Sequence, residues 1–259
     1  MDLKPISDKG VTVHTKNIAL VTGASAGIGE ALSHELIAQG WVVIGLARSL
    51  EKLMMMHTQL GPSFMPIACD VSSQSDIRRV SQAILDQNLC PSLFFLNAGI
   101  AGEKSMEHPD AFAVEVHERM MAVNYFGVLA FVECFETPCL ENSGAHFIVT
   151  SSVNAIFAAP TGSAYCASKA AISKAFESLS LRYFERNLKF SSIYTGPIAT
   201  DGLKGQWPFT WKPEKMAKYM CKFSASKKSR GYPSRFYFII CHVLRALPDR
   251  VVMRILKKI

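Results

Sequence analysis

The sequence predicts an α/β fold with three layers, in which a doubly wound parallel sheet lies between two layers of helices. Short apolar runs rich in β-branched residues alternate along the chain with longer helical patterns, as in parallel strands joined by crossover helices. The first run, residues 18–22, ends at a glycine-rich turn that leads directly into a helical pattern. At 259 residues the chain fits one large domain better than two small ones.

The turn after this first strand has the composition of a phosphate site. Gly23, Gly27 and Gly29 follow the strand with the spacing G-x-x-x-G-x-G, and the helical pattern begins there. This order places backbone N–H groups and the positive end of a helix at one point, which suits a phosphate. Glycine-rich turns between a strand and a helix also occur without a ligand, so the turn alone leaves both interpretations open.

Five further buried strands are predicted, each followed by a polar motif. They cover residues 41–46, 64–68, 93–96, 146–150 and 190–194. Helical patterns occupy about 111–137, 165–186 and 213–226. Ligands of doubly wound sheets bind beyond the carboxyl ends of the strands. We therefore expect one site there, built from the motifs that follow the strands.

Composition limits the function classes. The seven cysteines are scattered, odd in number and form no C-x-x-C pair, which favours a reducing cytoplasm without a disulfide framework or a zinc site. The histidines fall at no metal-ligand spacing, so we expect no metal. The N-terminus lacks the apolar core of a signal peptide, and no run approaches the ~20 apolar residues of a membrane span.

Charge is distributed unevenly along the chain. Residues 1–202 carry 14 basic and 19 acidic side chains, whereas residues 203–259 carry 14 and 2. Together with the strand pattern, this divides the chain into three parts. They are a polar leader (1–17), a sheet domain (18–233) and a basic helical C-terminal tail (234–259).

The tail has an amphipathic pattern of its own. Val251, Val252, Ile255 and Leu256 fall on one helical face, and the opposite face is basic. One interpretation is peripheral contact with an anionic membrane. The other is that the tail helices fold back over the substrate pocket or a subunit interface, and the sequence leaves both open.

The chemistry is clearest in the segment Tyr165-Cys-Ala-Ser-Lys169. Residues four apart lie on one face of a helix, and an ammonium beside a phenol lowers the pKa of the phenol. We therefore expect Tyr165 to exchange a proton near neutral pH. Ser152 lies thirteen residues earlier at a strand end, and Asn124 lies in a helix, where asparagine is a poor helix former. Such groups beyond a sheet edge can polarise and protonate a carbonyl.

Together the motifs have the order and spacing of a known family. From Thr22 to about Thr200 the sequence resembles a short-chain dehydrogenase/reductase, through T-G-x-x-x-G-I-G, C-D-V, N-A-G, V-N, S-S and Y-x-A-S-K. The resemblance implies a Rossmann-like fold and a catalytic set of Ser152, Tyr165, Lys169 and Asn124. In this set the tyrosine exchanges the proton, the lysine binds the nicotinamide ribose, the serine holds the substrate oxygen and the asparagine holds a relay water.

The resemblance also implies a site for a nicotinamide dinucleotide. The pyrophosphate would lie at the glycine turn, the adenosine beyond the third and fourth strands, and the nicotinamide beside the turn after the sixth. The residues implied are Gly23, Ser25, Ala26, Gly27, Ile28, Gly29, Arg48, Asp70, Val71, Asn97, Ala98, Gly99, Tyr165, Lys169, Pro197, Ile198 and Thr200.

Three positions depart from the family pattern or leave it ambiguous. Leu96 stands where the family often has a second asparagine, which would remove one hydrogen bond. Thr195 replaces the proline usual before Gly196, which could loosen that turn. Ser151 adjoins Ser152, and the spacing to the tyrosine favours Ser152 as the catalytic serine.

The end of the second strand indicates the cofactor. NAD-dependent enzymes usually place a carboxylate there for the ribose 2′-hydroxyl. Here the strand ends at Ala47-Arg48, and a guanidinium matches a 2′-phosphate. NADP(H) is therefore favoured over NAD(H), although Ala26 supplies no second basic group at a position often basic in NADP-dependent relatives.

The sequence thus predicts an oxidoreductase that transfers hydride between NADP(H) and a small-molecule carbonyl or secondary alcohol. Aromatic residues in the loops after the fifth and sixth strands favour an apolar substrate, although core packing explains them nearly as well. They are Phe157, Trp207, Phe209 and Trp211. The family resemblance implies a homodimer or homotetramer.

Three other functions share part of this pattern. A cofactor-binding regulatory or scaffold protein with vestigial catalysis is the alternative, and the intact Ser–Tyr–Lys–Asn set argues against it. A sugar-nucleotide epimerase shares the Tyr–Lys pair but has a longer C-terminal domain. Only the basic tail favours a nucleic-acid binder, and no reading motif accompanies it, so no nucleic-acid partner is expected.

Overall fold

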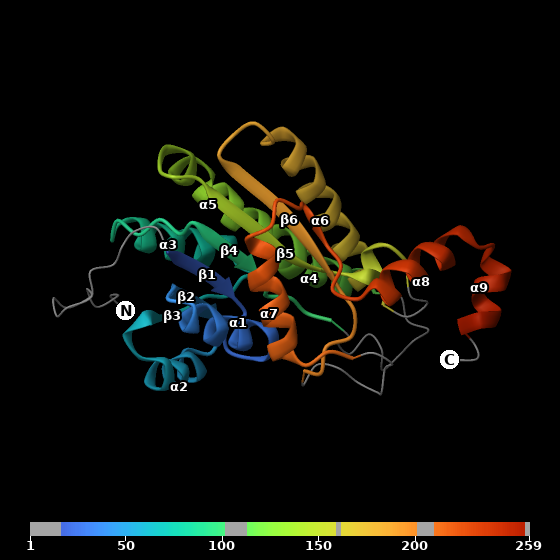
Figure 1. The fold of residues 1–259 in the computed structure, drawn as a ribbon, viewed down its shortest axis with the longest axis horizontal. Helices are drawn as coiled ribbons and strands as arrows, with labels where there is room; N and C mark the ends of the chain where they lie inside the picture. Colours follow the sequence, from blue (N-terminus) through green and yellow to red (C-terminus); the bar gives the residue numbers. More distant parts are fainter. Residues whose placement is uncertain (1–16, 102–112, 159–161, 201–209, 257–259) are drawn as a thin grey trace.

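The computed structural model describes residues 17–101, 113–158, 162–200 and 210–256. At its centre is a seven-stranded parallel sheet in the order β3-β2-β1-β4-β5-β6-β7 (Figure 1). The strands are β1 (Ile18–Thr22), β2 (Val42–Ala47), β3 (Phe64–Ala68), β4 (Leu93–Leu96), β5 (Ala145–Ser152), β6 (Leu188–Thr195) and β7 (Arg230–Gly231). The order reverses between β1 and β4, so the crevice expected of a doubly wound sheet lies beyond these two strands.

Helices cover both faces of the sheet. They are α1 (Gly27–Ala38), α2 (Leu50–Leu60), α3 (Gln74–Leu85), α4 (Val114–Met121), α5 (Gly127–Glu141), α6 (Ser163–Arg182), α7 (Pro213–Ser224), α8 (Arg235–Ala246) and α9 (Asp249–Leu256). Side chains of α1, α2 and α7 pack with one face of the sheet, and those of α3, α5 and α6 pack with the other. The molecule is therefore a single three-layer α/β/α domain, as the sequence predicts.

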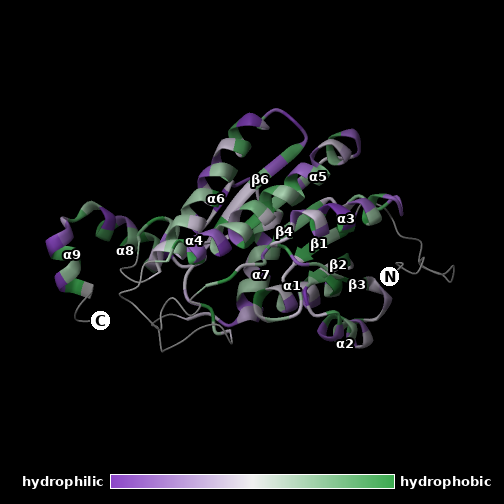
Figure 2. Cartoon of the chain, turned by 180° about the vertical axis from the view of Figure 1, so that it is seen from behind, coloured by the Kyte–Doolittle hydropathy of each residue, from purple (hydrophilic) through white to green (hydrophobic). Residues whose placement is uncertain are grey.

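The strands are buried because helices lie on both of their faces. Every residue of β1, β4 and β5 is buried, and Figure 2 shows the hydrophobic colouring of β1, β2 and β3. Phe94, Phe147 and Phe190 stand in register on three neighbouring strands, with ring centres 4.3 and 5.1 Å apart. This aromatic row ties β4, β5 and β6 together within one half of the sheet.

All six predicted strands are present, and the structure adds details that the pattern does not indicate. A seventh strand, Arg230–Gly231, lies shortly after the helical pattern predicted over 213–226, where no strand was predicted. The helix predicted over 165–186 spans Ser163–Arg182. The long helical region predicted at about 111–137 is divided by a π-helical turn, Ala122–Phe126, and continues to Glu141. Its first residues, 111 and 112, lie outside the described part.

Within the described residues, one helical stretch meets the length and hydropathy of a membrane span. It is the continuous run Val114–Glu141, within which an 18-residue window has a mean hydropathy of 1.2. Its apolar residues Val128, Phe131 and Phe135 are buried against the sheet. The stretch therefore has the packing of a core helix, although the sequence was expected to contain no apolar run of this kind.

Candidate active site

The glycine turn forms a tight cradle between β1 and α1. Gly23 and Gly27 have φ values of +68° and +57°, which favour glycine. A Cβ at Gly29 would lie 2.1 Å from the carbonyl oxygen of Gly23, so only glycine lets the helix start approach the strand end this closely. Ala26, exposed at the N-cap, gives α1 no side-chain cap. The uncapped helix N-terminus is therefore available to an anion.

The loop after β6 also contacts this cradle, although β6 belongs to the other half of the sheet. A Cβ at Gly27 would lie 2.9 Å from Cγ2 of Thr200, which follows β6. Ser25 and Ile28 are half-buried in the same turn. The structure therefore brings together the predicted pyrophosphate and nicotinamide segments, which lie far apart in the sequence.

The ends of β2 and β3 carry the predicted adenosine contacts. Arg48 is exposed immediately after β2, and the position holds no carboxylate. Asp70 is exposed after β3, and its Oδ1 accepts hydrogen bonds from the backbone N–H and the hydroxyl of Ser72, at 2.9 and 2.8 Å. A Cβ at Gly127 would lie 2.1 Å from the carbonyl oxygen of Val71. Gly127, which none of the sequence motifs includes, thus lets α5 approach the Asp70–Val71 segment.

Asn97 links three strand ends. Its Nδ2 donates to the carbonyl oxygen of Thr22 at 3.4 Å, and its Oδ1 accepts from the hydroxyl of Thr150 at 3.0 Å. The backbone N–H of Ala98 donates to Oγ1 of Thr22 at 2.9 Å. Gly99 is exposed, and a Cβ there would lie 3.2 Å from Nζ of Lys169. The Asn-Ala-Gly segment therefore supports the sheet edge beside Lys169.

The proposed catalytic residues converge where β5 ends and α6 begins. The phenol of Tyr165 forms a hydrogen bond with the hydroxyl of Ser152, the last residue of β5. Lys169, one helical turn after Tyr165, is buried, and its Nζ lies 5.8 Å from the centre of the tyrosine ring. The same Nζ donates a 2.8 Å hydrogen bond to the carbonyl oxygen of Thr150. The three side chains thus form one cluster.

The electrostatics of this cluster correct one expectation. Burial raises the pKa of the Tyr165 phenol, although its hydrogen bond with Ser152 acts in the opposite direction. Burial also lowers the pKa of Lys169 to about 8. The prediction that the lysine lowers the pKa of the tyrosine is therefore wrong for this structure. The ammonium is directed to a backbone carbonyl, and the cost of burying a phenolate dominates.

Asn124 lies in the π-helical turn and is fully used by protein partners. Its Oδ1 accepts from the N–H of Ile100 at 2.9 Å, and its Nδ2 donates to the carbonyl oxygen of Ile100 and to Oγ of Ser168, both at 3.0 Å. The side chain therefore fixes the segment after β4 against α6. The role that the resemblance implies, holding a relay water, stays a prediction. In this structure Oδ1 and Nδ2 of the side chain both form hydrogen bonds with protein groups.

The structure places two residues whose roles the family pattern left open, Ser151 and Thr195. Oγ of Ser151 lies 2.5 Å from Oγ of Ser173, inside the packing between β5 and α6, so Ser152 and not Ser151 meets the tyrosine. Thr195 pairs with Ser152 in the strand register, and its hydroxyl donates to the carbonyl oxygen of Ser151 at 3.0 Å. The expectation that this threonine loosens the turn stays a prediction, and its hydrogen bond ties the end of β6 to β5.

Trp211 holds the turn after β6 and also lines a small pocket there, together with Pro197 and Tyr237. Its N–H donates to the carbonyl oxygen of Pro197 at 3.0 Å, and its carbonyl oxygen accepts from the N–H of Ala199 at 2.8 Å. Its ring packs against Lys215 and Tyr219 of α7. Ile198 is buried, while Pro197 is half-buried. Trp207 and Phe209 lie outside the described residues. Of the four predicted aromatic residues, the structure therefore describes Trp211 beside Pro197 and the half-buried Phe157 after Ser152.

The first tail helix closes one side of this edge. A Cβ at Gly196 would lie 2.8 Å from Cδ2 of Tyr237 in α8. The inner residue Cys241 is buried, and α8 also contacts the 3₁₀ turn Val153–Ala155 that follows Ser152. The inward face of α8 therefore covers part of the catalytic edge, as one of the two interpretations of the tail predicted.

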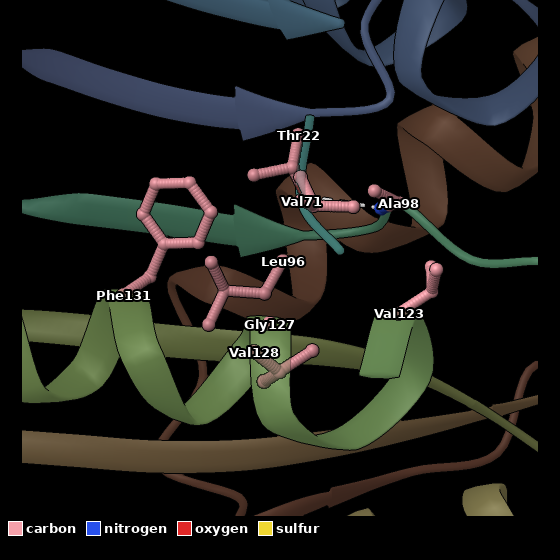
Figure 3. A pocket seen from close by; sticks show the side chains of 8 residues that line it. All are labelled: Thr22, Val71, Leu96, Ala98, Val123, Gly127, Val128 and Phe131. Atoms are coloured by element: carbon pink, nitrogen blue, oxygen red, sulfur yellow. Dashed lines mark hydrogen bonds between the residues drawn. The ribbon is translucent and has the colours of Figure 1, made fainter. Parts of the chain in front are cut away.

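A small apolar pocket lies below the predicted adenosine end. Figure 3 shows side chains from the ends of β1 and β4 and from the start of α5 directed into it. Its lining is Thr22, Val71, Leu96, Ala98, Val123, Gly127, Val128 and Phe131. Leu96, which stands where the family often has an asparagine, thus contributes an alkyl group and no hydrogen bond.

The residues present fit a nicotinamide dinucleotide. The glycine cradle would be filled by any Cβ, and it faces an uncapped helix N-terminus suited to a pyrophosphate. Sequence reasoning missed three residues that support the site, namely Thr22, Thr150 and Ser168. Each lies inside or beside a quoted motif, which was the available signal.

Known proteins resemble this chain over most of its length. A model described as short chain dehydrogenase matches residues 17–209. The NADPH-dependent 1-acyldihydroxyacetone phosphate reductase of Saccharomyces cerevisiae is 33% identical over 191 residues, which cover 72% of this chain and 62% of that protein. The 11-beta-hydroxysteroid dehydrogenase A of Sesamum indicum is 31% identical over 194 residues, which cover 73% and 55%. The matched part thus spans less than two thirds of either relative.

A solved structure has the same fold. A short chain dehydrogenase from Burkholderia cenocepacia, crystallised in complex with NADP, superimposes with a TM-score of 0.78. The sequences are 24% identical, and the match covers 93% of this chain and 98% of that chain. This likeness shows the fold, whereas function is inferred from the residues of the site.

Proposed function

We propose that this chain, which belongs to the short-chain dehydrogenase/reductase family, is an NADP(H)-dependent oxidoreductase for a carbonyl or secondary alcohol. The observation that carries the proposal is the cluster of Ser152, Tyr165 and Lys169 beyond the end of β5, beside the glycine cradle. When bound, the nicotinamide dinucleotide supplies or accepts the hydride.

The chain's own residues perform the proton chemistry. In reduction, Tyr165 donates its phenolic proton to the substrate oxygen while the carbonyl carbon receives the hydride. The buried phenol, whose pKa is raised, is protonated at neutral pH, which is the state from which it donates a proton in reduction. The hydroxyl of Ser152, already hydrogen-bonded to the phenol, is placed to hold the same substrate oxygen. In oxidation the tyrosine must first lose its proton to water, and the resulting phenolate then accepts the proton of the alcohol.

The preference for NADP(H) rests on Arg48. It is exposed at the end of β2, and no carboxylate stands at this position to bind the ribose 2′-hydroxyl. A guanidinium there can bind a 2′-phosphate with two parallel hydrogen bonds. The name of the yeast relative states NADPH dependence, which supports the same choice.

Apolar substrates are favoured by the names of the relatives and by α8. The two relatives are named for a steroid and for an acyl-bearing phosphate. In this chain Tyr237 of α8 packs at the edge of the site, and Phe157 lies in the loop after Ser152. We further propose a homodimer or homotetramer in the cytoplasm, consistent with seven free cysteines and with exposed Leu181 and Phe184 at the end of α6.

The test is turnover by the purified full chain. Steroid ketones, acyl-chain ketones, aldehydes and small polar ketones are assayed with NADPH and with NADH, following the absorbance of the reduced nicotinamide. We expect reduction of an apolar carbonyl with NADPH, and its loss in Tyr165→Phe. Tight NADPH binding without turnover of any compound would instead support a regulatory or scaffold protein.

A further inference from the structure

The tail helices α8 and α9 present two different faces. The inner face is anchored, because Tyr237 packs on Gly196, and Cys241 and Val252 are buried. Both helices extend from the body on the side of α4, at the end of the molecule away from α2 and α3 (Figures 1 and 2). Whatever covers their outer face therefore also approaches the catalytic edge.

The outer face is apolar along α8. Phe236, Ile239 and Val243 are 43%, 58% and 51% exposed. Their spacing of three and then four residues places them in one stripe along the helix. Val251 and Met253 of α9 are 39% and 44% exposed and add apolar area on two sides of this helix. A run of exposed large apolar residues of this kind marks an interaction surface.

Cations accompany this stripe. Arg235, Arg245, Arg250 and Arg254 are all exposed on the same two helices, where Asp249 is the one acidic residue in the described span. Apolar side chains flanked by arginines and nearly free of carboxylates complement an anionic lipid surface, whose headgroups attract the cations while the apolar groups enter the acyl boundary.

We propose that the outer face of α8–α9, defined by these five apolar residues and four arginines, docks on a membrane surface that contains anionic lipid. The helices lie in the interface and do not span it, because α8 has 12 residues and α9 has 8, against the ~20 needed to cross the hydrocarbon core. The inner face of α8 packs against the catalytic edge. Docking of the outer face would therefore bring this edge close to the lipid. The proposal concerns binding and does not depend on turnover.

The test compares binding of the full chain to two kinds of vesicle in a flotation assay. One kind is pure phosphatidylcholine, and the other contains about 30% phosphatidylserine, to supply the anionic surface. We expect flotation with the anionic vesicles only, and release at high salt because the arginine contribution is screened. If the protein stays in the aqueous fraction with both vesicles, the proposal is overturned.

Surface variants give the sharper comparison, because truncation of the tail would uncover Gly196. Ile239→Glu/Val243→Glu should abolish flotation. Arg245→Gln/Arg250→Gln/Arg254→Gln should weaken binding to anionic vesicles by at least roughly tenfold, since each cation contributes to the attraction. The matched control is Met54→Glu/Met55→Glu on α2, which alters two exposed methionines and should float like the unmodified chain.

Misfolding and self-association are tested by two further measurements. Circular dichroism and thermal unfolding show whether each variant is folded, and the arginine variant, which leaves the apolar stripe intact, tests the proposal if the glutamate variant does not fold. Light scattering after size exclusion reports the oligomeric state. If the glutamate pair on α8 dissociates an oligomer while the unmodified chain fails to float, the face is a subunit contact and the membrane proposal is wrong.

Discussion

The buried ammonium of Lys169 donates a 2.8 Å hydrogen bond to the main-chain oxygen of Thr150, two residues before Ser152. Among the described residues no carboxylate forms an ion pair with this lysine. A single carbonyl compensates only part of the cost of removing a charge from water, which is why burial lowers the pKa of the lysine to about 8. The buried charge of Lys169 therefore lowers the stability of the folded protein.

Replacing this lysine should stabilise the protein and inactivate it. Lys169→Met removes a buried charge and keeps much of the side-chain volume, so we expect the unfolding free energy to rise by about 2 kcal/mol at neutral pH. Turnover should fall by at least ~100-fold, because the cluster loses its cation. Thermal unfolding and steady-state rates measure the two effects.

The pH dependence distinguishes charge burial from altered packing. The pKa of Lys169 is lowered from 10.5 to about 8, so its penalty is complete below pH 8 and disappears as the pH rises toward 10.5. The stability difference between Lys169→Met and the unmodified chain should shrink over this range. Lys174→Met, on the exposed side of α6, is the control and should show no such trend. A constant difference would contradict the assignment of the penalty to the buried charge.

Tyr165→Phe should remove the proton donor and leave the cradle intact. General acid–base catalysis typically contributes ~10²–10⁴ in rate, and we expect kcat to fall by about that factor. The dissociation constant for NADPH, measured by fluorescence titration, should change little, because the glycine turn and Arg48 are untouched. A variant that keeps most of its turnover would show that another group donates the proton.

Arg48→Ala should separate the two cofactors. Loss of a charge-assisted hydrogen bond costs ~1.5–3 kcal/mol, so KM for NADPH should rise roughly tenfold or more while KM for NADH changes little. Lys52→Ala removes a nearby exposed cation from α2 and serves as the control. Equal effects of Arg48→Ala on both cofactors would refute the assignment.

His146 should make the fold sensitive to acid. Burial lowers its pKa from 6.5 to about 3, helped by the neighbouring charge of Lys189. The unfolded chain therefore binds a proton at a higher pH than the native state, and stability is lost as the pH falls from 6.5 toward 3. Denaturant unfolding should show a shallower pH dependence in His146→Gln, while His34→Gln, on the surface, should retain the original one.

Much of the fold and the site could be predicted because these features leave patterns within short stretches of the sequence. Buried strands appear as apolar runs, and a glycine with positive φ marks a turn that other residues avoid, as at Gly23 and Gly27. Tyr165 and Lys169 share a helix face by spacing alone. Each of these features depends on neighbours in the sequence.

The remainder depended on contacts between distant segments. The pKa of Tyr165 is set by burial among α6, β5 and their loops, so the spacing to the lysine gave the wrong direction. Trp211 packs on α7 and holds Pro197, which its place in a loop did not indicate. The two-residue strand β7 is too short to produce an alternating pattern, and its pairing with β6 becomes visible only in the assembled sheet.

The π-helical turn at Ala122–Phe126 has a consequence for insertions and deletions. Such a turn contains one more residue than a regular helical turn would need. Deleting that residue would rotate all of α5 by about 100° relative to α4, because each residue advances a helix by that angle. Asn124 could then meet Ile100 and Ser168 only if Phe131 and Phe135 left the sheet. We therefore expect this helix to tolerate point substitutions but not the loss of a residue, because the contacts of Asn124 and the packing of the core both depend on its length.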